Sequence, residues 1–365
     1  MSSTSKGWLV NICSILIGLV IALVACEFAL RWYGDFVLSQ EKMDVGLIQY
    51  DEKLGWKLAK NWSGQHQHFD YSAHYSTDFL GFRKSSVQKN ITNNRVLVMG
   101  DSFTFGLGVE DDQTFVSLMN TDNPDTIFIN GGVPGYAPDQ QMLWLREAVL
   151  STQPDSIVFI IYLGNDLVDI GLPFAVQAAY AKPYIALTED GVPVAKNIPV
   201  PRESKPEALR DKTLGSYILD GDRSTFLGRY KIGQLLIGAG LGSPVEKSDL
   251  EGLLEKKLKK PIALMGAALD LMMSEADQSF TLVLLPGASA VKSKSSVSAR
   301  YQLLVRDKLL DLARQKNLKA IDLVTPLSED GGNYFYPNDG HLTAAGHEVV
   351  SKALMQSLSE ASLAD

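Results

Sequence analysis

The sequence predicts a three-layer α/β/α domain with a parallel sheet, preceded by a transmembrane helix. Two observations support this prediction. From Arg95 onward, short apolar runs rich in β-branched residues alternate with segments of helical periodicity, as expected for a parallel sheet covered by helices on both faces. Near the N-terminus, Gly7–Cys26 contains no charged residue and is long enough to cross a bilayer.

The anchor comes first in the chain. At about 1.5 Å per residue, a helix over Gly7–Cys26 spans roughly 30 Å, the thickness of a hydrocarbon core. Lys6 precedes this segment, so the positive-inside rule favours a cytoplasmic N-terminus and a body in the periplasm or outside the cell. No convincing small-x-small cleavage site follows the apolar run, so simple secretion is not expected.

A lipoprotein is the alternative to an uncleaved anchor. Leu23-Val24-Ala25-Cys26 resembles a bacterial lipobox, which would make Cys26 a lipidated N-terminus. We favour the signal anchor, because the apolar character continues to Trp32 and Tyr33, as at the interfacial end of a spanning helix. Either way the protein is held at a membrane. Cys13 and Cys26 are the only cysteines, so the body has no disulfide and no thiol chemistry.

The chain divides into three parts. We expect the anchor and juxtamembrane segment in residues 1–40, a short β-rich leading segment in 41–94, and the main domain in 95–365. Strands of the main domain are predicted at Val96–Met99, Thr126–Ile129, Ser156–Tyr162, Phe280–Leu285 and Lys319–Leu323. Helices are predicted at Pro138–Leu150, Pro261–Ala276, Ser298–Gln315 and Thr343–Leu358. An insert at about 170–250, rich in Pro and Gly, is expected to shape a lid or wall over the site.

Charge argues against nucleic acid as a partner. The formal net charge of the 365 residues is -8, which gives no basic surface for phosphates. One short basic run, Lys256–Lys260, follows Glu251 and Glu255, and we interpret it as a solvated helix face rather than a contact with anionic lipid.

Four polar motifs follow predicted strands, where sites form in open parallel sheets. They are Gly100-Asp101-Ser102, Asn130–Gly135, Gly164-Asn165-Asp166 and Asp339-Gly340-His341. Each alone is typical of a turn or a helix cap. Together they offer a serine nucleophile, a histidine to remove its proton, and a carboxylate to orient the histidine.

In this order, the four motifs resemble the four blocks of the SGNH hydrolases, also called GDSL esterases, from Arg95 to the C-terminus. The resemblance implies a flavodoxin-like fold, with Ser102 as nucleophile, His341 as general base and Asp339 as its partner. It also implies an oxyanion hole formed by the backbone N–H groups of Ser102 and Gly135 and the side-chain amide of Asn165. Neither a metal nor an organic cofactor is needed. The Asp-x-His spacing is shorter than in many members and resembles the subgroup that acts on acetylated polysaccharides.

An α/β-hydrolase is the weaker interpretation, because Thr104 takes the last position of the Gly-x-Ser-x-Gly pattern. The resemblance implies an esterase acting on an acyl group, preferably O-acetyl, of a carbohydrate or other cell-envelope molecule. An O-acetyltransferase working with a membrane acyltransferase is an alternative, as is a lipid esterase with an apolar groove beside Ser102. A non-catalytic envelope scaffold is the hypothesis from another class, and it predicts that Ser102, Asp339 and His341 lie apart.

Other residues have simpler interpretations. His66, His68 and His74 lie close together in the sequence but lack a ligand set at metal spacing, so we expect exposed strand histidines. His347 lies within the predicted last helix and is expected to be structural. Asp101 is expected to support the turn below the serine, while Asp166 and Asp169 are expected to cap a segment or meet substrate hydroxyls. Stacking on a sugar and packing in the core remain equal alternatives for Phe103, Phe105, Tyr136 and Tyr162.

Overall fold

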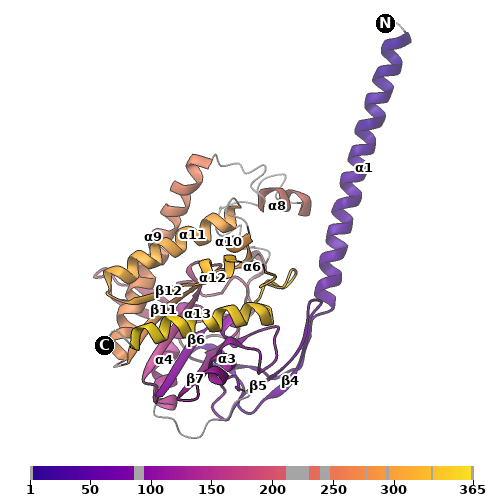
Figure 1. The fold of residues 1–365 in the computed structure, drawn as a ribbon. Coiled ribbons are helices and arrows are strands. Elements are labelled where there is room, and N and C mark those ends of the chain that lie inside the picture. The colour runs from indigo at the N-terminus through magenta and orange to yellow at the C-terminus, as the bar shows by residue number, and fades with distance from the viewer. Residues whose placement is uncertain are drawn as a thin grey trace.

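The structure, a computed structural model, is a three-layer α/β/α domain with a long N-terminal helix (Figure 1). It describes residues 3–85, 94–210, 230–238, 247–276, 278–292, 296–329 and 332–362. The five strands of its parallel sheet are β6 Asn94–Gly100, β7 Thr126–Gly132, β8 Ser156–Tyr162, β11 Ser279–Leu285 and β12 Lys319–Asp322. Their spatial order is β12-β11-β8-β6-β7. Counted along the chain, this is the flavodoxin-like order 2-1-3-4-5, so the predicted fold class is confirmed.

Alternate side chains of each strand point to opposite faces and build two cores. Leu97, Phe159 and Leu284 belong to a core with α4 Pro138–Thr152, α9 Lys247–Glu275 and α11 Val297–Gln315. Val98, Ile160 and Val283 belong to the other core, which α3 Phe115–Asp122 and α13 Ala344–Ser362 cover. Continuous apolar strands are therefore explained by burial on both faces. Figure 1 shows these helices on either side of the sheet.

One predicted helix start is wrong. The helix expected from Pro261 begins at Lys247, and the proline lies inside it. Leu250, Leu254 and Leu258 are buried at four-residue spacing, so their packing stabilises helix ahead of the proline. The remaining short helices are α2 Ser102–Phe105, α5 Asp166–Asp169, α6 Glu207–Arg210, α8 Lys231–Gly238, α10 Ala288–Lys292 and α12 Val324–Ser328.

The leading segment folds against the main domain. Its strands are β1 Lys42–Met43, β2 Ile48–Asp51, β3 Gly55–Leu58, β4 Ser63–Gln67 and β5 Ser72–Ser76. A third core joins it to the main domain through Tyr75 and Phe105, whose rings meet edge to face. The buried Arg83 guanidinium donates to the carbonyl oxygens of Phe105, Gly106 and Val109, just after α2.

The predicted insert carries the hairpin β9 Tyr184–Leu187 and β10 Pro193–Lys196 as well as α6 and α8. Residues 211–229 and 239–246 of this insert lie outside the described residues, and its expected role as a lid stays a prediction.

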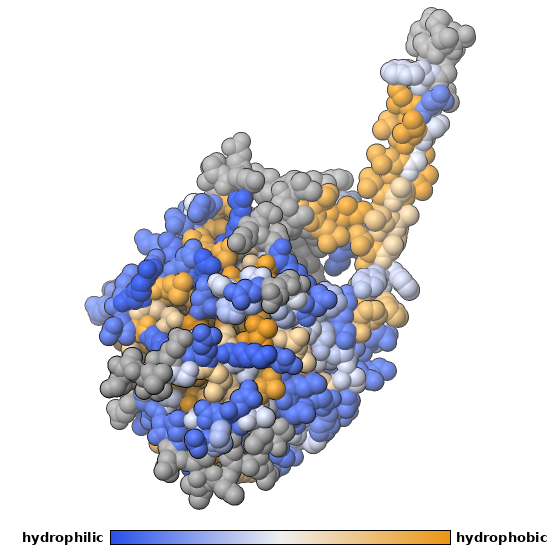
Figure 2. Space-filling model, viewed as in Figure 1, coloured by the Kyte–Doolittle hydropathy of each residue, from blue (hydrophilic) through white to orange (hydrophobic). Residues whose placement is uncertain are grey.

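The N-terminal helix α1, Ser3–Ser39, projects from this body (Figure 1). Its stretch Asn11–Ser39 is long and apolar enough to cross a membrane, and the most apolar part of this stretch is not buried against the rest of the chain. The last turns do contact the body, and Val37 is buried. Figure 2 shows the upper part of this helix standing clear of the body, while its apolar surface lower down meets an apolar patch of the body.

Candidate active site

Ser102 lies at the start of α2, directly after β6. Asp101 caps that helix by accepting a hydrogen bond from the Phe103 N–H at 2.9 Å. The expectation that Asp101 supports the turn is therefore confirmed. Burial raises the pKa of Asp101 to about 6, although the Phe103 N–H and the charge of His341 act in the opposite direction. The serine side chain is held at the carboxyl edge of the sheet and is 7% exposed.

His341 links the serine to a carboxylate. Its Nε2 lies 2.7 Å from the Ser102 Oγ, and its Nδ1 lies 2.6 Å from Asp339 Oδ1. An ionised carboxylate only accepts hydrogen bonds, so the proton of the neutral ring belongs on Nδ1 and the lone pair of Nε2 faces the serine. The structure thus brings together the three predicted triad residues, which come from opposite ends of the main domain.

A tight turn makes the one-residue spacing between Asp339 and His341 workable. Gly340 has φ 86°, a left-handed conformation that glycine adopts without strain. The backbone N–H of His341 also donates to Asp339 Oδ1, at 3.0 Å, so one oxygen holds both the ring and its backbone. Burial raises the pKa of Asp339, but the hydrogen bond and charge of His341 outweigh burial and keep that pKa below its ordinary value.

The two other predicted oxyanion-hole residues lie on the neighbouring loops. Gly135 has φ 78° in the loop after β7, where the Trp56 Nε1–H holds the Pro134 carbonyl at 3.0 Å. Asn165 precedes α5 and is 8% exposed. Its Nδ2 donates one hydrogen to Asp169 Oδ2 at 2.7 Å, and the amide carries a second hydrogen that can serve a substrate oxygen. The oxyanion-hole assignment stays a prediction.

Buried carboxylates support this edge of the sheet. Asp169 accepts from the Val176 N–H as well as from Asn165, and Asp166 accepts from the Tyr162 N–H. Asp169 therefore caps the segment that follows α5, as one of the two expectations had it, whereas Asp166 bonds back to the end of β8. Burial raises the pKa of Asp169 to about 6, and burial together with the Asp101 charge raises the pKa of Asp166 well above its ordinary value.

The leading segment supplies a supporting residue that no sequence motif indicates. Asp70 accepts hydrogen bonds from the backbone N–H groups of Asn338 and Asp339, at 2.8 and 2.9 Å, and from the Asn338 side-chain amide at 2.7 Å. Tyr71, the next residue, donates a longer hydrogen bond of 3.3 Å to Asp339 Oδ2. No pattern in the sequence indicates this contact, because Asp70 lies 269 positions from Asp339 in a segment without periodicity.

The histidines outside the triad have structural surroundings. His66 is buried, contrary to the exposed strand histidine we expected, and its Nδ1 lies 2.9 Å from the Tyr75 hydroxyl. His74 is exposed beside Ser63, as expected. Within the described residues, no group of three or more His, Cys, Asp or Glu side chains is placed to hold a metal ion. His347 is buried and accepts from a backbone N–H, and burial lowers its pKa to about 3, so it is structural as predicted.

Aromatic side chains line one side of the triad. Phe103 stacks on Tyr162 with ring centroids 4.1 Å apart, and its ring lies 4.7 Å from that of His341. Phe103, Phe105 and Tyr136 are buried, so core packing explains them better than sugar stacking. Tyr162 is half-buried and keeps both interpretations open.

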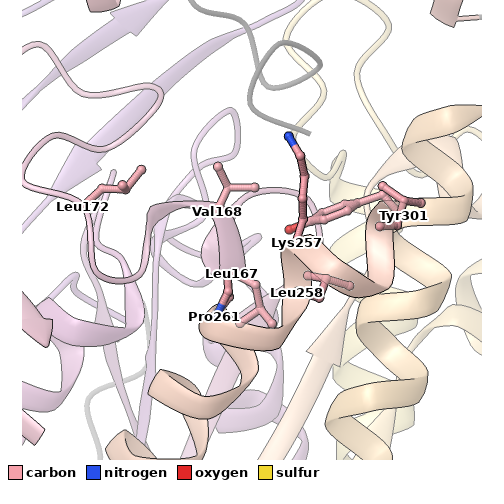
Figure 3. A pocket seen from close by; sticks show the side chains of 8 residues that line it. Leu167, Val168, Leu172, Lys257, Leu258, Pro261 and Tyr301 are labelled. Atoms are coloured by element: carbon pink, nitrogen blue, oxygen red, sulfur yellow. The ribbon is translucent and has the colours of Figure 1, made fainter. Parts of the chain in front are cut away.

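A cavity of about 230 Å³, which is distinct from the triad, lies between α5 and α9. Figure 3 shows its lining side chains, with Leu167, Val168, Leu258 and Pro261 on the apolar walls and the Tyr301 ring closing one side. None of the triad residues lines it. This cavity is therefore not the acyl groove beside Ser102 that a lipid esterase predicts.

Comparisons with known proteins found similar folds among solved structures. No family model matches the chain, and no curated protein matches it by sequence. Among solved structures, a lipolytic protein of the G-D-S-L family from Veillonella parvula is 13% identical, with 72% of this chain and 96% of that chain covered and a TM-score of 0.38. A lipase/acylhydrolase from Enterococcus faecalis is 14% identical, with 73% and 95% covered and a TM-score of 0.39. A catalytic mutant of an acetylxylan esterase from Geobacillus stearothermophilus is 11% identical, with 74% and 95% covered and a TM-score of 0.40.

Proposed function

We propose that this protein is a membrane-anchored serine esterase of the SGNH type, which hydrolyses an O-acyl ester on a carbohydrate of the cell envelope. The observation that carries the proposal is the continuous hydrogen-bonded chain from the Ser102 Oγ through His341 to Asp339, with both links under 2.8 Å. A scaffold without activity has no need of this alignment. The chain of contacts therefore favours an enzyme over a scaffold.

The geometry supports a two-step acyl transfer to water. The Ser102 Oγ attacks the ester carbonyl while His341 Nε2 takes the hydroxyl proton, and Asp339 stabilises the imidazolium that forms. Negative charge on the carbonyl oxygen is met by the N–H groups predicted at Ser102, Gly135 and Asn165. The histidine gives the proton to the leaving alkoxide, which departs as an alcohol. A water molecule then attacks the acyl-serine and loses a proton to the histidine. The histidine returns this proton to the Ser102 Oγ as the bond between that oxygen and the acyl carbon breaks, which releases the carboxylic acid and restores the enzyme.

An acetyl ester on a carbohydrate is the narrower part of the proposal. It follows from the Asp339-Gly340-His341 spacing, which resembles the subgroup active on acetylated polysaccharides. Placement at the envelope follows from α1, which is long and apolar enough to anchor the chain, with the body in the periplasm or outside the cell.

Hydrolysis of 4-nitrophenyl acetate by the full chain in detergent tests the chemistry. We expect Ser102→Ala to lower kcat by at least about 10³-fold, since the nucleophile is removed. Ser151→Ala is the matched control, because that serine lies near the end of α4 and bonds only the Ala148 carbonyl nearby. Equal rates for wild type and Ser102→Ala would contradict the proposal.

Acyl transfer to a sugar hydroxyl, with a membrane acyltransferase as donor partner, is a second candidate. The observation in its favour is the low exposure of Ser102 and Asn165, which are 7% and 8% exposed, because restricted water access favours another acceptor. Adding a saccharide acceptor to the acetate assay separates the two. An O-acetylated saccharide formed faster than acetate would identify a transferase, whereas acetate alone would identify a hydrolase.

A further inference from the structure

The anchor helix touches the loop that carries the catalytic carboxylate. The Tyr33 hydroxyl, near the end of α1, donates a hydrogen bond of 2.9 Å to Asn338 Oδ1. Phe69, next to Asp70, packs edge-on against the rings of Tyr33 and Phe36, at centroid distances of 6.2 and 5.9 Å. From Asn338 the contacts continue through the adjacent Asp339 to His341 and the nucleophile. The last turns of α1 therefore form one side of the support for the triad.

A second contact joins the anchor to the body about two turns earlier. Both carboxylate oxygens of Glu27 accept hydrogen bonds from the first backbone N–H groups of α8, Lys231 at 2.9 Å and Ile232 at 3.1 Å. Glu27 and Tyr33 are six residues apart, or roughly 9 Å along the helix. Two contacts at different levels restrain both the height and the tilt of the body relative to α1.

Glu27 also marks the edge of the hydrocarbon layer. The uncharged stretch ends at Cys26, and the ion pair of Glu27 with Arg31 follows directly. A lipidated Cys26 would place the edge at the same residue, so both forms of anchoring agree. Tyr33 lies seven residues after Cys26, which is roughly 10 Å beyond this edge and at the outer side of the headgroup region.

Helix α8, whose first N–H groups contact Glu27, presents apolar side chains near the level of Glu27. Leu235 and Leu236 are 60% and 40% exposed, and the neighbouring Tyr230 is 41% exposed. Figure 1 shows α8 beside α1, and Figure 2 shows its apolar surface adjoining the apolar length of the anchor. Because this surface is continuous with the membrane-spanning surface of α1, lipid is the partner that fits it.

We propose that α1 and α8 together hold Ser102 at a fixed height, within roughly 10–20 Å of the hydrocarbon edge, and that the substrate is an O-acylated saccharide carried on a membrane lipid. This inference rests on the esterase function proposed above. The ester bonds of a glycerophospholipid lie at the edge of the hydrocarbon layer, so an active site held at this height does not contact them. Acyl groups on a saccharide headgroup project to the level of the site. In this arrangement α8 lies in the interface with its leucines among the lipids.

The experiment changes the height alone. Seven polar, helix-forming residues inserted between Cys26 and Glu27 move the body roughly 10 Å further from the membrane. They also rotate it about the helix axis by nearly two full turns, so the side of the body that faces α1 stays almost the same. The same seven residues inserted between Lys6 and Gly7 lengthen the helix on the other side of the membrane and are the matched control. Both variants and wild type are placed in phosphatidylcholine nanodiscs.

Three acetylated probes report the result. They are per-O-acetylated methyl maltoside in solution, the same acetylated maltose on a dialkylglycerol in the nanodisc, and that lipid with an ethylene glycol spacer of roughly two helical turns' length. We expect the variant with the Cys26/Glu27 insertion to hydrolyse the soluble probe at the wild-type rate. It should hydrolyse the lipid probe without a spacer at least tenfold more slowly than wild type does, and the lipid probe with the spacer at the wild-type rate. The Lys6/Gly7 insertion is expected to match wild type on all three.

The outcomes distinguish the two proposals. If the raised variant hydrolyses the short lipid probe at the wild-type rate, the fixed height is wrong while the esterase stands. If wild type hydrolyses neither the soluble nor the lipid probes, the esterase fails and this inference fails with it. A fluorophore on Leu235→Cys, in a chain with Cys13→Ser and Cys26→Ser, gives a readout independent of activity. We expect spin-labelled lipid to quench it in wild type, and less in the raised variant; no quenching in wild type would overturn the placement of α8.

Discussion

Removing the Asp70 carboxylate should loosen the catalytic loop without touching a catalytic residue. Asp70 is half-buried and accepts three hydrogen bonds from Asn338 and Asp339. Hydrogen bonds to a partly solvated carboxylate contribute about 0.5–1 kcal/mol each, so their loss costs the loop about 2 kcal/mol. Since about 1.4 kcal/mol corresponds to a factor of ten, Asp70→Ala should lower kcat by about 10–30-fold. The KM for a small acetate ester should stay unchanged, because Asp70 does not contact the ester.

Asp70→Asn sharpens this test. The amide oxygen can still accept both backbone N–H groups, and the Asn338 amide can turn over to offer its oxygen to the new NH₂ group. The Tyr33 hydroxyl then accepts from Asn338 instead of donating to it. We therefore expect Asp70→Asn to retain at least about a third of wild-type kcat, within the few tenths of a kcal/mol that exposed polar exchanges cost.

Asp78 provides the matched control. It is half-buried like Asp70, and its Oδ1 accepts from three backbone N–H groups, those of Leu80, Gly81 and Phe82. Asp78→Ala should lower the melting temperature by about as much as Asp70→Ala, a few degrees for a chain of this size, with kcat near wild type. Stopped-flow and steady-state assays with 4-nitrophenyl acetate give kcat for all three variants. A wild-type kcat in Asp70→Ala would refute the positioning role.

Two further predictions concern Asn165 and the buried ion pair of Lys182 with Asp139. Asn165→Ala should lower kcat by about 10²–10³-fold with KM little changed, as for loss of one oxyanion donor, and an unchanged kcat would remove Asn165 from the oxyanion hole. Lys182→Met should cost about 3–5 kcal/mol in urea unfolding, because Asp139, 2.7 Å from the ammonium, would be left buried and unpaired. Lys308→Met breaks the exposed pair with Glu255 and should cost less than about 1 kcal/mol; similar losses in both variants would show that burial is not the cause.

The parts of the site that the sequence could predict are those that follow strands. Ser102 and His341 are 239 residues apart, yet both follow predicted strands of one parallel sheet, whose carboxyl ends share an edge. Continuous apolar runs were informative for the strands, because each strand is buried on both faces. Proline was misleading at Pro261, which we interpret from the sequence as a helix start although buried leucines extend the helix before it.

Three contacts that support the site could not be predicted, and they involve Asp70, Asp169 and Tyr33. Asp70 acts through backbone groups of the catalytic loop, and backbone groups carry no sequence signature. Asp169 was recognised only as a possible cap or substrate contact, since its bond to Asn165 depends on the turn of α5 that brings positions four apart together. Tyr33 looked like an interfacial aromatic of the anchor, and nothing in its surroundings along the chain indicates Asn338.

Burial of an ionised carboxylate at the sheet edge lowers the stability of the protein, while its hydrogen bonds orient residues of the site. Both effects can be measured at Asp169. Its raised pKa, about 6, means that folding favours its protonated form. Its contribution to stability is therefore fully present below about pH 4 and is lost as pH rises through 6, a change of roughly 3 kcal/mol.

Asp169→Asn cannot ionise, but its single oxygen cannot accept from both the Val176 N–H and the Asn165 amide, at a cost of about 1–2 kcal/mol. Urea unfolding should show the variant more stable than wild type at pH 7 and no more stable at pH 4, while kcat falls about tenfold or more because the Asn165 amide is no longer oriented. Equal pH dependence in both proteins with an unchanged kcat would mean that Asp169 is ionised at no cost and orients nothing.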